Sequence, residues 1–529
     1  MHLTKFLIVS VLAVASVAAA AAAAAADKPN ILIIYADDVG WGDLGCYGAT
    51  KVTTPHLDDL AARGIRFTDA HTTASTCTPS RYSILTGQYS FRNKSAQILP
   101  GDANMLIKPG TPTLPAVLKE HGYATACIGK WHLGLGIGRI DWNGQINATP
   151  LDIGFDESFL IPATPDRVPC VYVEGRQVVG LDPADPLQVN QYKKVGTDPT
   201  GHDHPELLRY PADGDHSGTI VDRISRMGFM SGGNAARWQD EQMTPVLVQR
   251  AEKFITQRAA KPFFLYLALN DVHVPRAPGP QFIGRSQCGL RGDQIEEMDW
   301  AVGQIMAKLD ELHLTDNTLV LFSSDNGPIL FDGYTDGSRR DLNGHAPGGP
   351  FRGGKYEIYE GGTRVPFIAF WPGHVKPGRS DALVSQVDLF RTLAHVAGIA
   401  NDASIPADSR DLMPALLDAS AAGRQELVEQ AGVDLAIRQG KWKLIPAGVH
   451  KAFRSVEEGD PSPPPVFGSK EAHLFDLSID PGERQDVAGE HPEVVAELTK
   501  QLQAARQAGE SGRNPRPRQW HSGTRKAKE

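Results

Sequence analysis

The sequence predicts an α/β fold: a mostly parallel sheet sandwiched by helices, followed by a smaller antiparallel sheet with one helix. Two observations predict it. Short apolar runs alternate with helix-like segments over most of the chain, which is typical of a parallel sheet covered on both faces. Nearer the C-terminus, short strand-like pieces follow one another before a single helix-like segment, and this order favours an antiparallel sheet packed against one helix.

The first element is the apolar run at residues 30–35 (NILIIY), which reads as a buried strand that leads into a polar, glycine-rich loop. The other strand candidates are 124–128, 263–269, 318–323 and 367–370, with helix candidates such as 113–121 and 293–312 between them. In such sheets ligands bind beyond the carboxyl ends of the strands. The polar residues after four of these runs are Asp37 and Asp38, Lys130 and His132, Asp271 and His273, and Asp325 and Asn326. We therefore expect them to converge on one site.

The C-terminal part has strand candidates at 435–437, 442–445 and 473–476, and then a helix candidate at 493–508. Residues 162–235 are rich in Pro, Gly and Asp, which favours long loops over the active face, and 461–465 is a proline-rich stretch in an irregular loop. These patterns divide the chain into a catalytic unit at 27–430, a small α+β unit at 431–508 and a flexible basic tail at 509–529.

The N-terminal segment 1–26 has the features of a cleaved signal peptide. Lys5 precedes an apolar run at 6–17 and an alanine tract, and small residues at the end of the segment favour cleavage. The alternative is an uncleaved membrane anchor, because the combined apolar length approaches the ~20 residues that span a bilayer. We expect a periplasmic or secreted protein with no membrane segment after cleavage.

The net charge of the chain argues against two classes of binding partner. A formal net charge of -9 over 529 residues argues against general affinity for nucleic acid or anionic membranes.

The five cysteines are Cys46, Cys77, Cys127, Cys170 and Cys288. If Cys77 is used for chemistry, the other four either form up to two disulfides, which export permits, or stay free thiols.

The most informative string is Cys77 to Arg81 (CTPSR), followed by 85–87 (LTG) at what looks like a helix start. It resembles the signature of the cysteine-type, formylglycine-dependent sulfatases, which have an alkaline-phosphatase-like fold. The resemblance implies that a formylglycine-generating or sulfatase-maturing enzyme oxidises Cys77 to formylglycine before or during export. It also implies that Arg81 holds this region and offsets its charge.

A sulfate ester is a poor electrophile that needs a strong nucleophile and cations around its oxygens. An aldehyde hydrate provides two hydroxyls: one can attack sulfur and expel the alcohol, and the other then helps to release the sulfate. A serine or an unmodified cysteine would be left as a stable sulfated enzyme. The chemistry therefore agrees with the function that the resemblance implies.

Asp37, Asp38, Asp325 and Asn326 offer hard oxygen ligands from two strand ends, which suits Ca²⁺ and, less strictly, Mg²⁺. The lack of a His or Cys cluster argues against zinc. Either pair alone would often be a loop-capping pair. The resemblance implies that these residues bind one calcium ion, which also touches the formylglycine at position 77.

The remaining catalytic candidates are basic residues. The resemblance places Lys130 and His132 in the sulfate pocket, where the lysine holds sulfate and the histidine positions or deprotonates the formylglycine. His273 matches the general acid, although Val272 stands where a proline is common. Lys355 matches a second sulfate-binding cation and an alternative acid.

The substrate is less constrained. Export and a polar, loop-rich middle favour a sulfated carbohydrate, such as galactose or N-acetylgalactosamine sulfate, over a lipid or steroid sulfate, and an aryl sulfate is an expected model substrate. Arg340 and His345 lie in a loop that either binds sugar hydroxyls or is simply solvated. Two other functions stay open: a phosphate or phosphonate monoester hydrolase of the same superfamily, and a non-catalytic protein that binds sulfated glycans.

Overall fold

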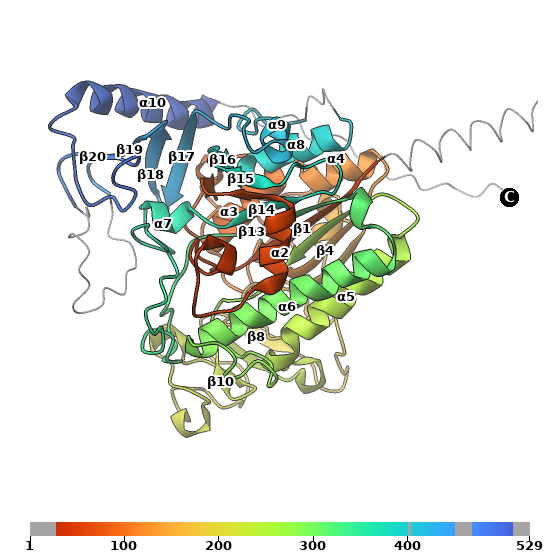
Figure 1. The fold of residues 1–529 in the computed structure, drawn as a ribbon. Coiled ribbons are helices and arrows are strands. Elements are labelled where there is room, and N and C mark those ends of the chain that lie inside the picture. The colour runs from red at the N-terminus through yellow and green to blue at the C-terminus, as the bar shows by residue number, and fades with distance from the viewer. Residues whose placement is uncertain (1–27, 400–403, 450–467, 512–529) are drawn as a thin grey trace, which may run out of the picture.

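The computed structural model describes residues 28–399, 404–449 and 468–511 (Figure 1). The predicted signal peptide, the proline-rich stretch 461–465 and the tail from residue 512 lie outside the described residues. In the described part of the chain, no helix combines the length and the apolar character that crossing a bilayer requires.

A ten-stranded mixed sheet forms the centre of the molecule (Figure 1). From edge to edge its strands are β15 (Gly378–Ser380), β2 (Ile65–Phe67), β14 (Phe367–Phe370), β13 (Thr318–Ser324), β1 (Asn30–Ala36), β12 (Phe263–Ala268), β4 (Ala124–Lys130), β5 (Glu157–Ile161), β6 (Val173–Glu174) and β7 (Gln177–Val178). The central strands β13, β1, β12, β4 and β5 run parallel. They are apolar and buried because helices cover both faces, and the predicted mostly parallel sheet is confirmed.

Two groups of helices pack around this sheet. The first contains α2 (Pro55–Arg63), α5 (Met243–Arg258) and α6 (Gly289–Glu311), and the second contains α3 (Cys77–Thr86), α4 (Leu114–Glu120), α8 (Leu389–Val396) and α9 (Met413–Leu417). The helix predicted from residue 113 begins one residue later because Thr113 is its N-cap: the Thr113 side chain accepts a hydrogen bond from the Ala116 N–H. Helix α6 begins before its predicted start at 293.

The middle of the chain contains only very short strands. They form the antiparallel pairs β8 (Gln188–Asn190) with β11 (Phe229–Ser231), and β9 (Ile220–Val221) with β10 (Ile224–Ser225). A further short pair joins β3 (Ala70–His71) to β16 (Val384–Ser385).

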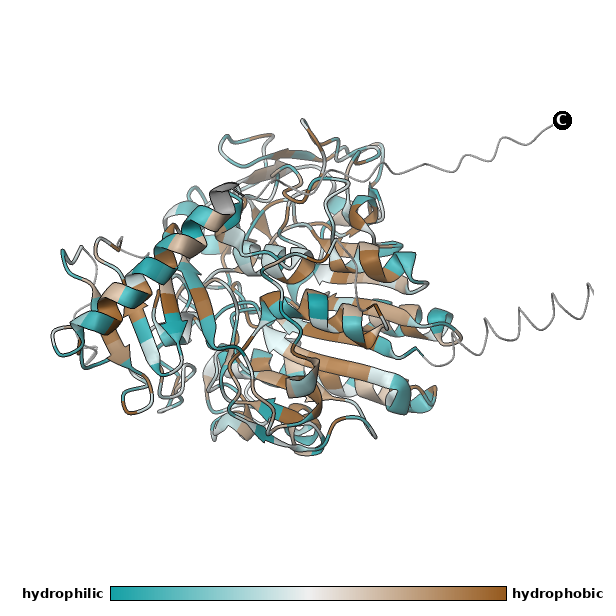
Figure 2. Cartoon of the chain, turned by 90° about the horizontal axis from the view of Figure 1, so that it is seen from above, coloured by the Kyte–Doolittle hydropathy of each residue, from teal (hydrophilic) through white to brown (hydrophobic). Residues whose placement is uncertain are grey.

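A separate antiparallel sheet follows, as predicted, with the order β17 (Glu426–Ala431), β18 (Asp434–Gln439), β19 (Trp442–Ile445) and β20 (His473–Asp476). Helix α10 (Pro492–Ser511) lies across it (Figure 2) and buries Leu498 and Leu502 against it. No predicted strand covers β17, which crosses the predicted boundary between the two units at residue 430. Its buried Glu429 and Gln430 hide the apolar pattern of a strand.

A buried ionic cluster joins the two sheets. Lys443 Nζ on β19 lies 3.1 Å from Glu360, 2.9 Å from Glu429 and 3.4 Å from Glu483, and all four side chains are fully buried. Buried carboxylates are tolerated only with such partners. Because Glu360 begins the short helix α7 (Glu360–Thr363), the cluster fixes the loop before α7 against the C-terminal sheet.

The five cysteines are free thiols. Of the two arrangements that the sequence left open, disulfides or free thiols, the structure therefore has free thiols.

Candidate active site

The predicted polar residues lie at one edge of the central sheet. Asp37 and Asp38 follow β1, Lys130 ends β4, and Asp325 follows β13. Since these strands are parallel and lie within four consecutive strands of the sheet (β13, β1, β12 and β4), their carboxyl ends lie together. His273, Asn326 and Lys355 join the same group, and every one of these side chains is buried.

The acidic and amide side chains contact one another across the strand ends. The Asn326 side-chain amide donates to Asp38 Oδ1 at 2.7 Å, and the Asp38 backbone N–H points at Asp325 Oδ1 at 3.4 Å. Two buried oxygens, Asp37 Oδ1 and Asn326 Oδ1, have no hydrogen-bond partner among the residues that the structure describes. A buried acceptor without a partner is costly, so this pair marks a place for an additional positive group.

These residues fit a hard divalent cation. One potential donor atom from each of Asp37, Asp38, Cys77 and His273 lies within 4.8 Å of the others. The His273 ring is engaged by a lysine, as described below, which leaves the carboxylate oxygens of Asp37 and Asp38 and the Cys77 sulfur in this set. A set of carboxylate and amide oxygens is the ligand set that Ca²⁺ prefers.

Three buried cations surround the acids. Lys130 Nζ lies 2.5 Å from Asp37 Oδ2, Lys355 Nζ lies 3.0 Å from Asp38 Oδ2, and Arg81 donates through Nε to Asp325 Oδ2 at 2.9 Å. Burial alone would raise the pKa of Asp38, but Lys355 and Lys130 outweigh it and hold that pKa below its usual range. Asp38 therefore stays ionised beside positive charges, whereas burial and the neighbouring Asp325 raise the pKa of Asp37 well above its usual range.

Cys77 is the first residue of α3 and is almost fully buried. Burial raises the pKa of its thiol to about 12, and the nearby Lys130 and Lys355 offset only part of that effect. The thiol is protonated at neutral pH and is a weak nucleophile in this form. Unmodified Cys77 is therefore poorly suited to attack an ester.

The two histidines differ in how their rings are held. His273 Nδ1 lies 2.6 Å from the Val274 carbonyl, so we assign the ring proton to Nδ1, and Nε2 accepts from Lys355 Nζ at 3.0 Å. His132 donates through Nε2 to the Leu99 carbonyl at 2.9 Å, while its buried Nδ1 has no partner in the described residues. Burial and the neighbouring lysines hold the pKa of both rings well below the usual range, so both are neutral.

The structure adds residues that the sequence analysis missed. Asp332 lies 2.9 Å from Lys355 Nζ and accepts a hydrogen bond from the Tyr356 hydroxyl at 3.1 Å. Arg167 lies close enough to Cys77 and Asp332 for their charges to interact with it. Asp332 and Arg167 follow no strand, so the strand-end rule could not find them. Tyr356 could have been found from the sequence, because it directly follows the predicted site residue Lys355.

Arg340 and His345 occupy different surroundings. The exposed Arg340 pairs with its neighbour Asp341, and the buried His345 lies 2.8 Å from Asp43 through Nε2. No hydrogen bond or ion pair within the described residues joins either side chain to the lysines or acids of the cluster. Sugar binding by these two residues stays a prediction.

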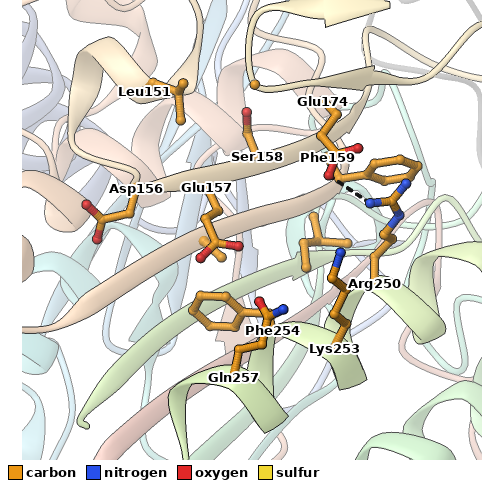
Figure 3. A pocket seen from close by; sticks show the side chains of 13 residues that line it. Leu151, Asp156, Glu157, Ser158, Phe159, Glu174, Arg250, Lys253, Phe254 and Gln257 are labelled. Atoms are coloured by element: carbon orange, nitrogen blue, oxygen red, sulfur yellow. Dashed lines mark hydrogen bonds and ion pairs between the residues drawn. The ribbon is translucent and has the colours of Figure 1, made fainter. Parts of the chain in front are cut away.

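A second cleft lies away from this site, between the strands β4 and β5 and helix α5 (Figure 3). Its volume is about 220 Å³, and Arg250 pairs with Glu174 at 2.7 Å across one side. It is lined by none of the predicted site residues, and both acidic and basic side chains line it. It therefore lacks the concentrated positive charge that a sulfate group requires.

Comparisons with known proteins agree with this site. The Sulfatase family model matches residues 29–149 and 182–399. The chain is 47% identical over 486 residues to the N-acetylgalactosamine-6-O-sulfatase of Bacteroides thetaiotaomicron, covering 91% of this chain and 94% of that protein. It is 36% identical over 506 residues to human Arylsulfatase A, covering 90% and 87% of the two chains.

A solved structure from a study of glycosaminoglycan metabolism by Bacteroides thetaiotaomicron superposes with a TM-score of 0.87 at 47% identity, covering 91% of this chain and 99% of that one. The family model, the relatives that align over nearly their whole length and the shared fold all indicate the same family. The chain belongs to the sulfatase family of sulfuric ester hydrolases.

Proposed function

We propose that this protein removes 6-O-sulfate groups from N-acetylgalactosamine or galactose units of glycans. The observation that carries the proposal is the 47% identity, over nearly the whole of both chains, to a protein named N-acetylgalactosamine-6-O-sulfatase. The buried group of lysines and carboxylates beside Cys77 supplies the chemistry that such an ester requires. The proposal includes one calcium ion and a formylglycine at position 77.

Calcium at Asp37, Asp38, Asp325 and Asn326 would supply a Lewis acid for sulfate oxygens, and formylglycine at position 77 would supply a hydroxyl nucleophile. The chain's own side chains supply the remaining interactions with the substrate. Lys130 and Lys355 place two positive charges beside Cys77, which lowers the cost of bringing in an anionic sulfate ester.

Arg81 has a positioning role. Its guanidinium donates both to Asp325 and, at 3.2 Å, to the Lys130 carbonyl, so it links the first turn of α3 to the ends of β13 and β4. Cys77 lies one helical turn before Arg81. This contact fixes the distance between the reacting residue and the oxygen ligands.

The proton for the departing alcohol comes from the pair His273 and Lys355. Lys355 is held protonated because Asp332 and Asp38 outweigh burial and keep its pKa above the usual range. His273 Nε2 accepts a hydrogen bond from the Lys355 ammonium in the resting site, and transfer of the Lys355 proton to Nε2 would give an imidazolium and a neutral amine. A ring in this position can pass the proton on to a leaving oxygen.

We predict that His273→Ala lowers turnover of N-acetylgalactosamine 6-sulfate about 10²–10⁴-fold, the usual value of general acid catalysis, and turnover of 4-nitrophenyl sulfate far less. A sugar alcohol leaves poorly unless it is protonated, whereas an acidic phenol needs little help. Lys130→Ala should lower both rates alike, because it weakens the holding of sulfate itself. Equal losses in His273→Ala would make this residue structural and Lys355 the preferred acid.

The substrate is tested by steady-state assays on the wild-type protein. We expect kcat/KM for N-acetylgalactosamine 6-sulfate to exceed the value for the 4-sulfate by at least about 100-fold, because a misplaced ester loses the aligned geometry. Comparable release of phosphate from 4-nitrophenyl phosphate would favour the phosphatase alternative. Saturable binding of sulfated sugar without any sulfate release would favour the non-catalytic alternative.

Export and maturation complete the proposal. The signal-like segment 1–26 supports a periplasmic or secreted location. The string CTPSR at 77–81 supports a formylglycine-generating or sulfatase-maturing enzyme as a transient partner.

A further inference from the structure

A cleft of about 530 Å³ opens in the loop-rich middle of the chain, in the region around β8 and β10 in Figure 1. This volume lies within the range of roughly 300–1,000 Å³ that is common for small-molecule sites. Tyr192, Lys194, His202, Asp203 and Phe229 are among the side chains that line it. None of the predicted catalytic or metal-binding residues is among its lining residues.

The cleft borders the segment that carries Asp166 and Arg167, close to the active site. Met227 lines the cleft, and its backbone N–H donates to the Asp166 carbonyl at 2.7 Å. The next residue, Arg167, pairs with Met227 in a β-bridge and lies near Cys77. Ser217 also lines the cleft, beside a histidine whose ring lies 3.5 Å from the Asp166 carboxylate.

The side chains of the cleft suit a sugar ring. Tyr192 is 80% exposed, an unusual state for a large aromatic residue, and Phe229 is half-buried nearby. An exposed aromatic face offers apolar area at little cost in conformational entropy, and a pyranose ring presents a matching C–H face. Gln191 adds polar atoms beside the aromatic surface.

The charges of the cleft favour an uncharged ring. Lys194 is paired at 2.9 Å with Asp203, so its charge is already compensated. Asp215, which also lines the cleft, then leaves one negative charge in excess. An additional sulfate or uronate group would be repelled here, in contrast to the lysine-rich catalytic group.

We propose that this cleft binds a neutral sugar unit of the glycan chain, next to the sulfated unit that enters the catalytic group. The inference rests on the proposed function, because it assumes a sulfated glycan as the substrate. Tyr192 is the stacking platform in this subsite, and the Gln191 side-chain amide is a hydrogen-bonding partner for ring hydroxyls.

The test compares kcat/KM for 6-O-sulfated N-acetylgalactosamine alone and within a neutral trisaccharide. Tyr192→Ala should lower kcat/KM for the trisaccharide about tenfold, mainly through KM, and change the value for the monosaccharide less than twofold. Tyr192→Phe keeps the ring and should retain the trisaccharide rate. Ile479→Ala, at a residue that is 79% exposed on the C-terminal unit, is the matched surface control.

A calorimetric titration with the unsulfated neutral trisaccharide tests the cleft without any turnover. Saturable binding by the wild type that Tyr192→Ala abolishes supports the subsite even if no sulfated sugar is hydrolysed, in which case only the proposed function fails. Equal effects of Tyr192→Ala on monosaccharide and trisaccharide, or trisaccharide binding that the variant retains, would overturn the subsite. A better rate with a uronate-containing trisaccharide than with the neutral one would also contradict it.

Discussion

Cys77→Ala should lower sulfate release by about 10⁴-fold or more, because it removes the carbon-bound group from which the nucleophile is made. The variant should still fold. Cys77 is buried at the start of α3, and alanine fits the same space without leaving a polar atom unpaired. Initial rates on 4-nitrophenyl sulfate and circular dichroism of the same preparation measure the two expectations.

Cys127→Ala is the matched control for this experiment. Cys127 is an equally buried free thiol on β4, and the residue has no part in the proposed chemistry. It should lose a little stability and keep its rate within about twofold. If Cys77→Ala keeps more than a tenth of the wild-type rate, position 77 does not provide the nucleophile.

Removal of calcium should abolish turnover and lower the melting temperature, and calcium should restore both. An ion bound only by the folded state stabilises it by mass action, which amounts to about 2.7 kcal/mol at 100 times the dissociation constant. The unpaired buried oxygens of Asp37 and Asn326 are the structural reason to expect this dependence. Differential scanning calorimetry over a calcium series measures the shift.

Two isosteric variants separate the metal effect from a general loss of stability. Asp325→Asn and Asp240→Asn each remove a buried carboxylate that pairs with an arginine, but only Asp325 belongs to the proposed calcium ligands. Asp325→Asn should raise the calcium concentration for half of the thermal shift about 10–100-fold. Asp240→Asn should leave this calcium concentration unchanged. An unaltered calcium response in both variants would remove Asp325 from the metal site.

Much of the fold and the centre of the site could be predicted because both depend on strands with a simple pattern. Parallel strands covered on both faces are apolar throughout, so runs such as NILIIY are visible without an alignment. A polar residue at the carboxyl end of such a strand lies at the same edge of the sheet as the corresponding residues of its parallel neighbours. Asp37, Lys130, His273 and Asp325 follow this rule, and the structure places them together.

The rest depends on loops and on buried ion pairs, which leave no periodic signal. Asp332 reaches Lys355 from a loop, and Arg167 belongs to the irregular segment after β5. Strand β17 was missed for a related reason: its Glu429 is buried because Lys443 neutralises it, so its polarity gives the wrong indication of exposure. Such residues are placed by tertiary partners distant in the sequence.

The most direct test of the account is mass spectrometry of the peptide that contains Cys77, taken from active wild-type protein. The account predicts an aldehyde in place of the thiol, in a fraction of molecules that rises in proportion to the specific activity across preparations. The buried thiol, with its pKa raised to about 12, cannot provide that activity itself. Fully active protein that contains only unmodified Cys77 would contradict the account.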